Sequence, residues 1–249
     1  NEKRGLAKGR RLGCQACVQG DVVIDVPAES QVHKQVIRKD ASARPVKMNP
    51  ATRLYYVEVA EPDMHEPSGD FERLKIALQD QWEIREVELD FFQFNKLQKT
   101  LRKGNWAITV AIFNDHTSTP PRIVEIWPGL YEQGLYGLAI DLGSTTIAAH
   151  LTDLKSGEVL KSAGLMNPQI RFGEDLMSRV SYSMMNSGGD KEMTTVVREA
   201  INSLIEQLRI EAEIEKNSLV EVVFVCNPVM HHLLLGIDPV ELGQAPFAL

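Results

Sequence analysis

The chain has 249 residues, of which 43% are hydrophobic and 24% are charged, and its formal net charge is −7. This is the composition of an ordinary globular protein of one or two domains with a sizeable core. The acidic balance argues against nucleic acid as the main partner. No apolar run approaches the roughly 20 residues of a membrane span. The opening NEKRGLAKGRR also lacks the apolar core of a secretory signal.

Three cysteines, an odd number in a long chain, favour a reducing compartment over a disulfide scaffold, so we expect a cytoplasmic protein. The sequence does not begin with Met, and it ends at APFAL within a hydrophobic pattern. We therefore expect a fragment of a longer protein.

Residues 1–39 contain Cys14-Gln15-Ala16-Cys17, whose CxxC spacing is that of half a zinc site or of a redox pair. No second CxxC follows in the sequence, and the residues that flank a thioredoxin motif are missing. A complete metal site within this chain is therefore not expected. The next residues, 40–52, have two prolines and mixed charge, which is typical of a linker.

Residues 53–130 follow a β-α-α-β-β pattern, which predicts a compact α+β middle module. The helices are expected from Phe71 to Gln81, capped by Ser68 or Asp70, and over Glu88–Arg102. Its aromatic side chains are interpreted as core rather than as a cofactor site. They are Trp82, Phe91, Phe92, Phe94 and Trp106.

The most informative stretch is Leu135–Thr152, LYGLAIDLGSTTIAAHLT, in which two apolar runs flank a polar turn. Gly143 is expected to take a positive φ and to let a ligand approach closely. Ser144, Thr145 and Thr146 place hydroxyls beside backbone N–H groups, which suits phosphate oxygens. Asp141, at the end of the first strand, is suited to Mg²⁺ through its water shell. The turn is not a Walker loop, and a purely structural hairpin turn remains the alternative.

A second hairpin is predicted over residues 148–165, and helices are predicted over residues 174–185 and, capped by Asp190, 193–208. The unbroken apolar run Val220–Cys226 predicts a buried strand. Asn227 and Pro228 then open a short helix. Asn227 either lines a ligand cleft at the carboxyl end of that strand or simply caps the helix.

The β-β-β-α-β-α order from residue 135 resembles the first half of the actin, sugar-kinase and heat-shock-chaperone ATPase fold. The fold class implied is α/β, with an α+β middle module before the first ATPase lobe and a mixed sheet with leading hairpins. In that family the first hairpin turn contacts phosphate. The resemblance therefore places Asp141, Gly143, Ser144, Thr145 and Thr146 at the ATP and Mg²⁺ site.

The segment RRLGCQACVQGDVVIDVP resembles the end of a plant-type [2Fe–2S] ferredoxin domain. This resemblance implies that Cys14 is the fourth cluster ligand and that Cys17 is not a ligand. The other three ligands would lie upstream of residue 1, so this chain alone would not hold the cluster in the usual way.

Together with RFGEDLMSR and NPVMHHLLLG, these segments resemble the iron–sulfur ATPases that reductively activate corrinoid proteins. The domains implied are a ferredoxin remnant (1–39), a linker (40–52), the middle domain (53–130) and an incomplete ATPase lobe (135–249). The activity implied is ATP-driven transfer of one electron from a [2Fe–2S] cluster to cob(II)alamin, and this fragment alone is expected to be inactive. The partners implied are a corrinoid protein or methyltransferase and a reducing electron donor, with no nucleic acid and no membrane.

Two other functions remain open. One is a sugar- or acid-kinase-like phosphotransferase that uses the same Asp141 turn, although no catalytic carboxylate for it stands out. The other is a non-catalytic nucleotide-binding assembly module. The sequence does not identify the corrinoid partner or the electron donor, and it leaves the oligomeric state open, a homodimer included.

Overall fold

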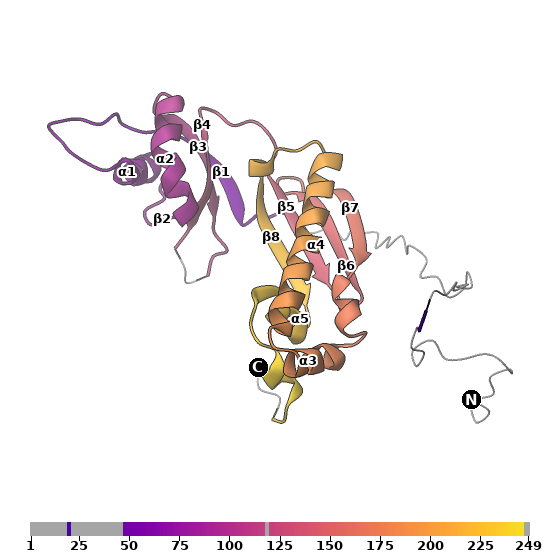
Figure 1. Ribbon diagram of the computed structural model, residues 1–249. Helices are drawn as coiled ribbons and strands as arrows, with labels where there is room; N and C mark the ends of the chain where they lie inside the picture. Colours follow the sequence, from indigo (N-terminus) through magenta and orange to yellow (C-terminus); the bar gives the residue numbers. More distant parts are fainter. Residues whose placement is uncertain (1–18, 21–46, 118–119, 247–249) are drawn as a thin grey trace. The chain divides into compact units, whose positions relative to one another are not determined.

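The computed structural model describes residues 19–20, 47–117 and 120–246 of the chain, which divides into two compact units, residues 1–36 and 37–249. The expectations for Cys14 and Cys17 therefore lie outside the described residues. The helices and strands described below all belong to the second unit (Figure 1).

A first mixed sheet is built from residues 52–128, and its strand order is β1-β3-β4-β2. Strands β1 and β3 and strands β3 and β4 pair antiparallel, whereas β2 pairs parallel with β4. Its elements are β1 (Thr52–Glu58), α1 (Asp70–Trp82), β2 (Glu88–Leu89), α2 (Phe91–Lys103), β3 (Ala107–Phe113) and β4 (Arg122–Pro128).

Helices α1 and α2 pack on this sheet through apolar side chains spaced three or four residues apart. Leu74 and Leu78 of α1 and Leu97 and Leu101 of α2 join one buried cluster with the inward-facing residues of the strands, such as Ile108. The first sheet and its two helices thus share one buried core.

The second predicted helix begins later than expected. Glu88 and Leu89 extend and pair with Arg122 and Ile123, and the side chain of Asp90 accepts a hydrogen bond from Phe92 N, which caps α2. The two-residue strand β2 forms only because it pairs with the distant strand β4, so no local sequence pattern predicts it. The N-cap of α1 is Gly69 rather than Ser68 or Asp70.

The prediction that the aromatic side chains form the core is wrong for four of the five. Trp82, Phe91, Phe92 and Phe94 are between 45% and 77% exposed, and only Trp106 packs against the core. In α2 the buried stripe is Gln93, Leu97 and Leu101. The three phenylalanines flank that stripe at the start of the helix, where the sheet does not cover them.

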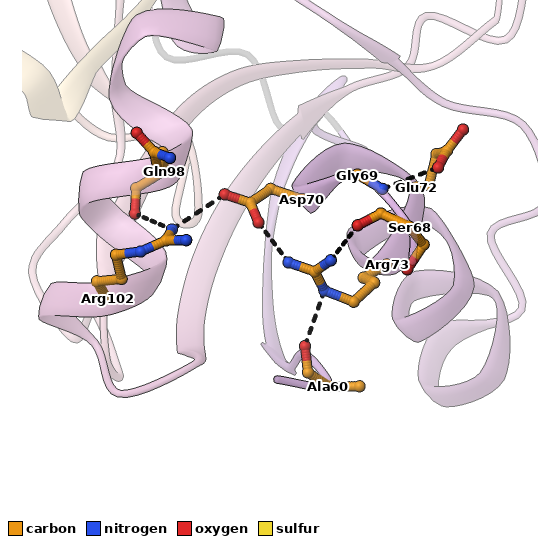
Figure 2. Close-up of polar contacts among 8 residues, drawn as sticks. All are labelled: Ala60, Ser68, Gly69, Asp70, Glu72, Arg73, Gln98 and Arg102. Carbon is orange, nitrogen blue, oxygen red and sulfur yellow. Dashed lines mark hydrogen bonds and ion pairs between the residues drawn. The ribbon is translucent and has the colours of Figure 1, made fainter. Parts of the chain in front are cut away.

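A buried arginine fixes the start of α1 (Figure 2). Arg73 donates from Nε to Ala60 O (3.0 Å) and from its two terminal nitrogens to Ser68 O and to the Asp70 carboxylate. The other oxygen of Asp70 accepts from Arg102 of α2 at 3.1 Å. One carboxylate therefore ties the two helices together.

The second mixed sheet has the order β7-β6-β5-β8, in which only β5 and β8 pair parallel. Its strands are β5 (Tyr136–Leu142), β6 (Thr146–Asp153), β7 (Val159–Met166) and β8 (Leu219–Cys226). The helical elements are η4 (Pro168–Phe172), α3 (Leu176–Met185), α4 (Gly189–Glu211), η5 (Lys216–Ser218), α5 (Pro228–Leu235) and η6 (Val240–Gly243).

Helix α4 runs along one face of this sheet (Figure 1). Val197, Ile201, Leu204 and Leu208 of α4 pack on the alternate residues of β5 and β6 that face it, among them Ile140. The helical period read from the sequence is confirmed. The N-cap is Gly188 in the left-handed conformation (φ 81°) rather than Asp190, which lies in the first turn.

Strand β8 exists where the apolar run predicted it, but it is not buried. Val222, Val223, Phe224 and Val225 are between 36% and 68% exposed. The strand pairs with β5 on one side and lies at the edge of the described sheet, so its other side and much of both faces are uncovered.

None of the helices in the described part of the chain has the length and apolar character of a membrane span.

Candidate phosphate-binding site

The turn between β5 and β6, residues Gly143–Thr146, is the centre of the candidate site and is called the 143–146 turn below. It is closed by a hydrogen bond from Gly143 N to Thr146 O (3.0 Å). Gly143, Ser144 and Thr146 are half-buried and Thr145 is exposed. The strand–turn–strand arrangement expected from the sequence is therefore present.

Gly143 is needed for a reason other than the one expected. Positive φ angles occur at Gly129, Gly157, Gly188 and Gly236, but Gly143 is not among them. A Cβ atom at Gly143 would instead lie 2.7 Å from Thr146 O, the oxygen that closes the turn. The position needs space rather than a left-handed backbone.

Asp141 lies one residue before the end of β5 and is half-buried. It is paired with Ala148 of β6 and with Val225 of β8. Since Ile140 and Leu142 face the core under α4, the alternation of the strand directs Asp141 to the opposite face. The carboxylate therefore sits beside the turn, on the face that α4 does not cover.

Buried polar side chains donate hydrogen bonds to the turn from the protein interior. Asn167 and Arg179 are both 0% exposed. Asn167 donates from Nδ2 to Gly143 O (2.8 Å) and from its backbone N to Thr145 O (2.8 Å), while Arg179 donates to Ser144 O. Three successive carbonyl groups of the turn thus have partners in the interior.

Arg179 lies on the buried side of α3 and connects several elements. It also donates to Gly173 O (3.0 Å), Gln169 Oε1 (3.2 Å) and Met230 Sδ (3.0 Å). Burial lowers the pKa of its guanidinium from the usual value, and the nearby charge of Asp175 acts in the opposite direction. An arginine remains protonated in this setting, so a positive charge is held beneath the turn.

No motif in the sequence indicates a role for Asn167 or Arg179. The available signal was the position of Arg179 next to Val180 on the inner side of a helix, where a charged residue needs several partners. Which backbone oxygens would supply them depends on the packing of η4 against the turn, and no local pattern carries that information.

Asn227 caps α5, because its Oδ1 accepts from Met230 N at 3.0 Å. Leu142 is paired with Cys226 in the parallel β5–β8 ladder, so Gly143 and Asn227 follow neighbouring strands at the same edge of the sheet. Carboxyl ends of parallel strands are where open α/β sheets place ligands. Capping is the observed role of Asn227, and lining a cleft stays a prediction.

Among the residues that the structure describes, no group of three or more His, Cys, Asp or Glu side chains could hold a metal ion. Cys14 lies outside the described residues, so its assignment as a cluster ligand stays a prediction. Cys226 is half-buried, and burial raises the pKa of its thiol. A cavity of about 550 Å³, lined by Thr52, Tyr131 and Asp153 among others, does not include the 143–146 turn.

The residues that are present fit a phosphate group. The glycine allows the turn to close without a clash at Thr146 O, hydroxyl residues follow it, and a buried cation donates to the turn from the interior. The fold and this turn define the class: a mixed α/β protein with a candidate phosphate-binding hairpin at the carboxyl edge of its second sheet.

Comparison with known proteins identifies the family. Residues 136–249 match the family model described as the RACo middle region, and residues 41–133 match the one described as the RACo linker region. The corrinoid activation enzyme RamQ of Eubacterium limosum is 32% identical over 127 residues, which are 51% of this chain and 21% of that protein. Together the two models match most of the chain, which therefore consists largely of RACo linker and middle regions.

A solved structure supports the same identification. The reductive activator for a corrinoid, iron–sulfur protein is 29% identical and superposes with a TM-score of 0.70, covering 90% of this chain and 37% of that one. The α/β class with mixed sheets is confirmed. An archaeal actin homologue, Ta0583, also aligns at 13% identity, but its TM-score of 0.31 is too low for a structural conclusion. The match covers 21% of RamQ, and the chain covers 37% of the reductive activator.

Proposed function

We propose that this chain supplies the linker module and the first ATPase lobe of a protein that reductively activates a corrinoid partner in an ATP-dependent reaction. The observation that carries the proposal is the 143–146 turn, supported by buried Asn167 and Arg179, in a chain that matches the RACo linker and middle regions. Related proteins are named as a corrinoid activation enzyme and as a reductive activator, which supports a corrinoid protein as the partner.

In this proposal each residue at the turn has a separate task. The turn Gly143–Thr146 binds the phosphates of ATP through backbone N–H groups and hydroxyls of the residues that follow Gly143, and Asp141 orients the water shell of Mg²⁺. Asn227 lines the same cleft from the neighbouring strand. When bound, Mg²⁺ neutralises negative charge on the phosphates and so assists hydrolysis.

The proposed redox step reduces cob(II)alamin of the partner to cob(I)alamin by one electron. In the longer protein Cys14 would be one ligand of a [2Fe–2S] cluster, and that cluster would supply the electron, which an external reductant would replace. The proposed division into a ferredoxin remnant (1–39), a linker (40–52), a middle domain (53–130) and an ATPase lobe (135–249) follows from the same resemblance.

The test uses a protein extended to the length of these relatives. We expect it to show the visible absorption of a [2Fe–2S] cluster and to convert cob(II)alamin in a corrinoid protein only when MgATP is present. The Asp141→Ala variant should keep the absorption and no longer convert cob(II)alamin when MgATP is present. An iron-free extended protein, or ATP turnover that requires a small polyol and no corrinoid, would contradict the proposal.

A further inference from the structure

The backbone of the 143–146 turn is oriented by two side chains from outside the hairpin. Gly143 O accepts from Nδ2 of Asn167 at 2.8 Å, and Ser144 O accepts from a terminal nitrogen of Arg179. Both donors are fully buried. The carbonyl groups of two consecutive peptide units therefore point into the interior beneath the turn.

Covalent geometry then fixes the direction of the amides. In a planar trans peptide the C=O of one residue and the N–H of the next point in opposite directions. The inward carbonyls of Gly143 and Ser144 thus direct the N–H groups of Ser144 and Thr145 away from the interior. Two successive N–H groups on one side of a turn form an anion-binding concavity.

Arg179 contributes charge as well as geometry. Its recorded acceptors are the carbonyls of Ser144 and Gly173, Oε1 of Gln169 and the sulfur of Met230, and none of these is a carboxylate. The nearby charge of Asp175 offsets part of the positive potential of Arg179. Because the hydrogen bonds of the guanidinium go only to neutral groups, the remainder would favour an anion bound at the turn.

We propose that Arg179 and Asn167 are positioning residues for phosphate binding: they hold the turn so that the amides of Ser144 and Thr145 face the phosphates. This rests on the proposed function and adds to it, because neither residue contacts the ligand side of the turn. Asn167 acts by orientation alone, and Arg179 acts by orientation and charge.

Two variants separate these effects from simple damage to the fold. Arg179→Met keeps much of the side-chain length but removes the donors and the charge. Asn167→Ser keeps an oxygen that can accept from Gln169 N, as Asn167 Oδ1 does at 2.9 Å, and it loses the amide that reaches Gly143. The matched control is Met193→Ala, which opens the same buried region and leaves both donors in place.

Binding is measured with magnesium tripolyphosphate and the 249-residue chain, by titration of the amide NMR signals. In the unsubstituted chain the signals of Ser144 and Thr145 should move on titration. In Arg179→Met and Asn167→Ser the affinity should fall about tenfold, the order expected when one hydrogen bond that orients the turn is lost. Met193→Ala should lower the thermal midpoint and leave the affinity unchanged.

The outcomes distinguish the two proposals. If the unsubstituted chain does not bind tripolyphosphate, the phosphate site fails and the positioning role fails with it. If it binds and both variants bind equally well, the positioning role alone is overturned. Should Met193→Ala weaken binding as much as the other two, their effect is general destabilisation, which also overturns it. If Arg179→Met does not fold, Asn167→Ser decides.

Discussion

Asp70 accepts hydrogen bonds from two arginines on different helices, Arg73 of α1 and Arg102 of α2 (Figure 2). The Arg73 side chain is almost fully buried, so this carboxylate and the carbonyls of Ala60 and Ser68 must stabilise its buried charge. Removing one partner of a buried charge is costly, because the other is left without compensation.

We therefore expect Asp70→Asn to lower the free energy of unfolding by about 1–3 kcal/mol. All three tryptophans, Trp82, Trp106 and Trp127, lie in the module built on the first sheet, so tryptophan fluorescence during urea unfolding reports on it. The control is Glu88→Gln, which breaks a pair with Arg122 at 3.7 Å whose side chains are half exposed. That change should cost no more than about 0.5 kcal/mol. Equal shifts of the two urea midpoints would contradict the assignment.

At the scale of single elements, α4 provides the largest apolar stripe under the second sheet. Leu204 is 1% exposed and packs in the same cluster as Leu138, Ile140 and Leu151 of the strands. Ile210, on the outer side of the same helix, is 60% exposed.

We expect Leu204→Ala to lower the free energy of unfolding by about 2–5 kcal/mol, since it removes buried methyl groups and leaves a cavity. Ile210→Ala should change it by less than about 0.5 kcal/mol. Circular dichroism at 222 nm follows helix content and so reports on α4 during unfolding. A destabilisation by Ile210→Ala as large as that by Leu204→Ala would show that α4 packs through a different face.

The helices and strands were largely predictable because each leaves a local pattern. The stripe of α4, the β5–β6 and β6–β7 hairpins and the Asn227-Pro228 helix start depend on residues close in sequence. Strand β2 depends on pairing with β4 and was missed. The exposure of Phe91, Phe92 and Phe94 was also missed, because periodicity shows that a helix is amphipathic and does not show what covers each face.

The candidate site was predictable to the same extent. The hairpin turn and the place of Asp141 near the end of β5 are predictable from a short motif. The positive φ predicted for Gly143 was wrong. Buried support from Asn167 and Arg179 requires η4 and α3 to pack beneath the turn, which is a tertiary property. Where a residue acts through a contact distant in sequence, its type alone gives little information about its role.

At the scale of the whole molecule, β8 raises a problem of solubility. Val222, Val223, Phe224 and Val225 lie in succession on the outermost strand of the described sheet. An edge strand with unpaired backbone groups and exposed apolar side chains is a template for pairing with another chain. Neither face of β8 has the charged side chains that usually prevent this, apart from Glu221 at its start.

We therefore expect the 249-residue chain to self-associate as its concentration rises, through β8. Val225→Lys should reduce this association, since Val225 is 68% exposed and a lysine there places charge on the edge. Leu130→Lys is the matched control, because Leu130 is 65% exposed and lies outside every strand. Sedimentation velocity over a range of concentrations measures the effect. A chain that stays monomeric throughout, or an equal gain from Leu130→Lys, would show that β8 is not the associating surface.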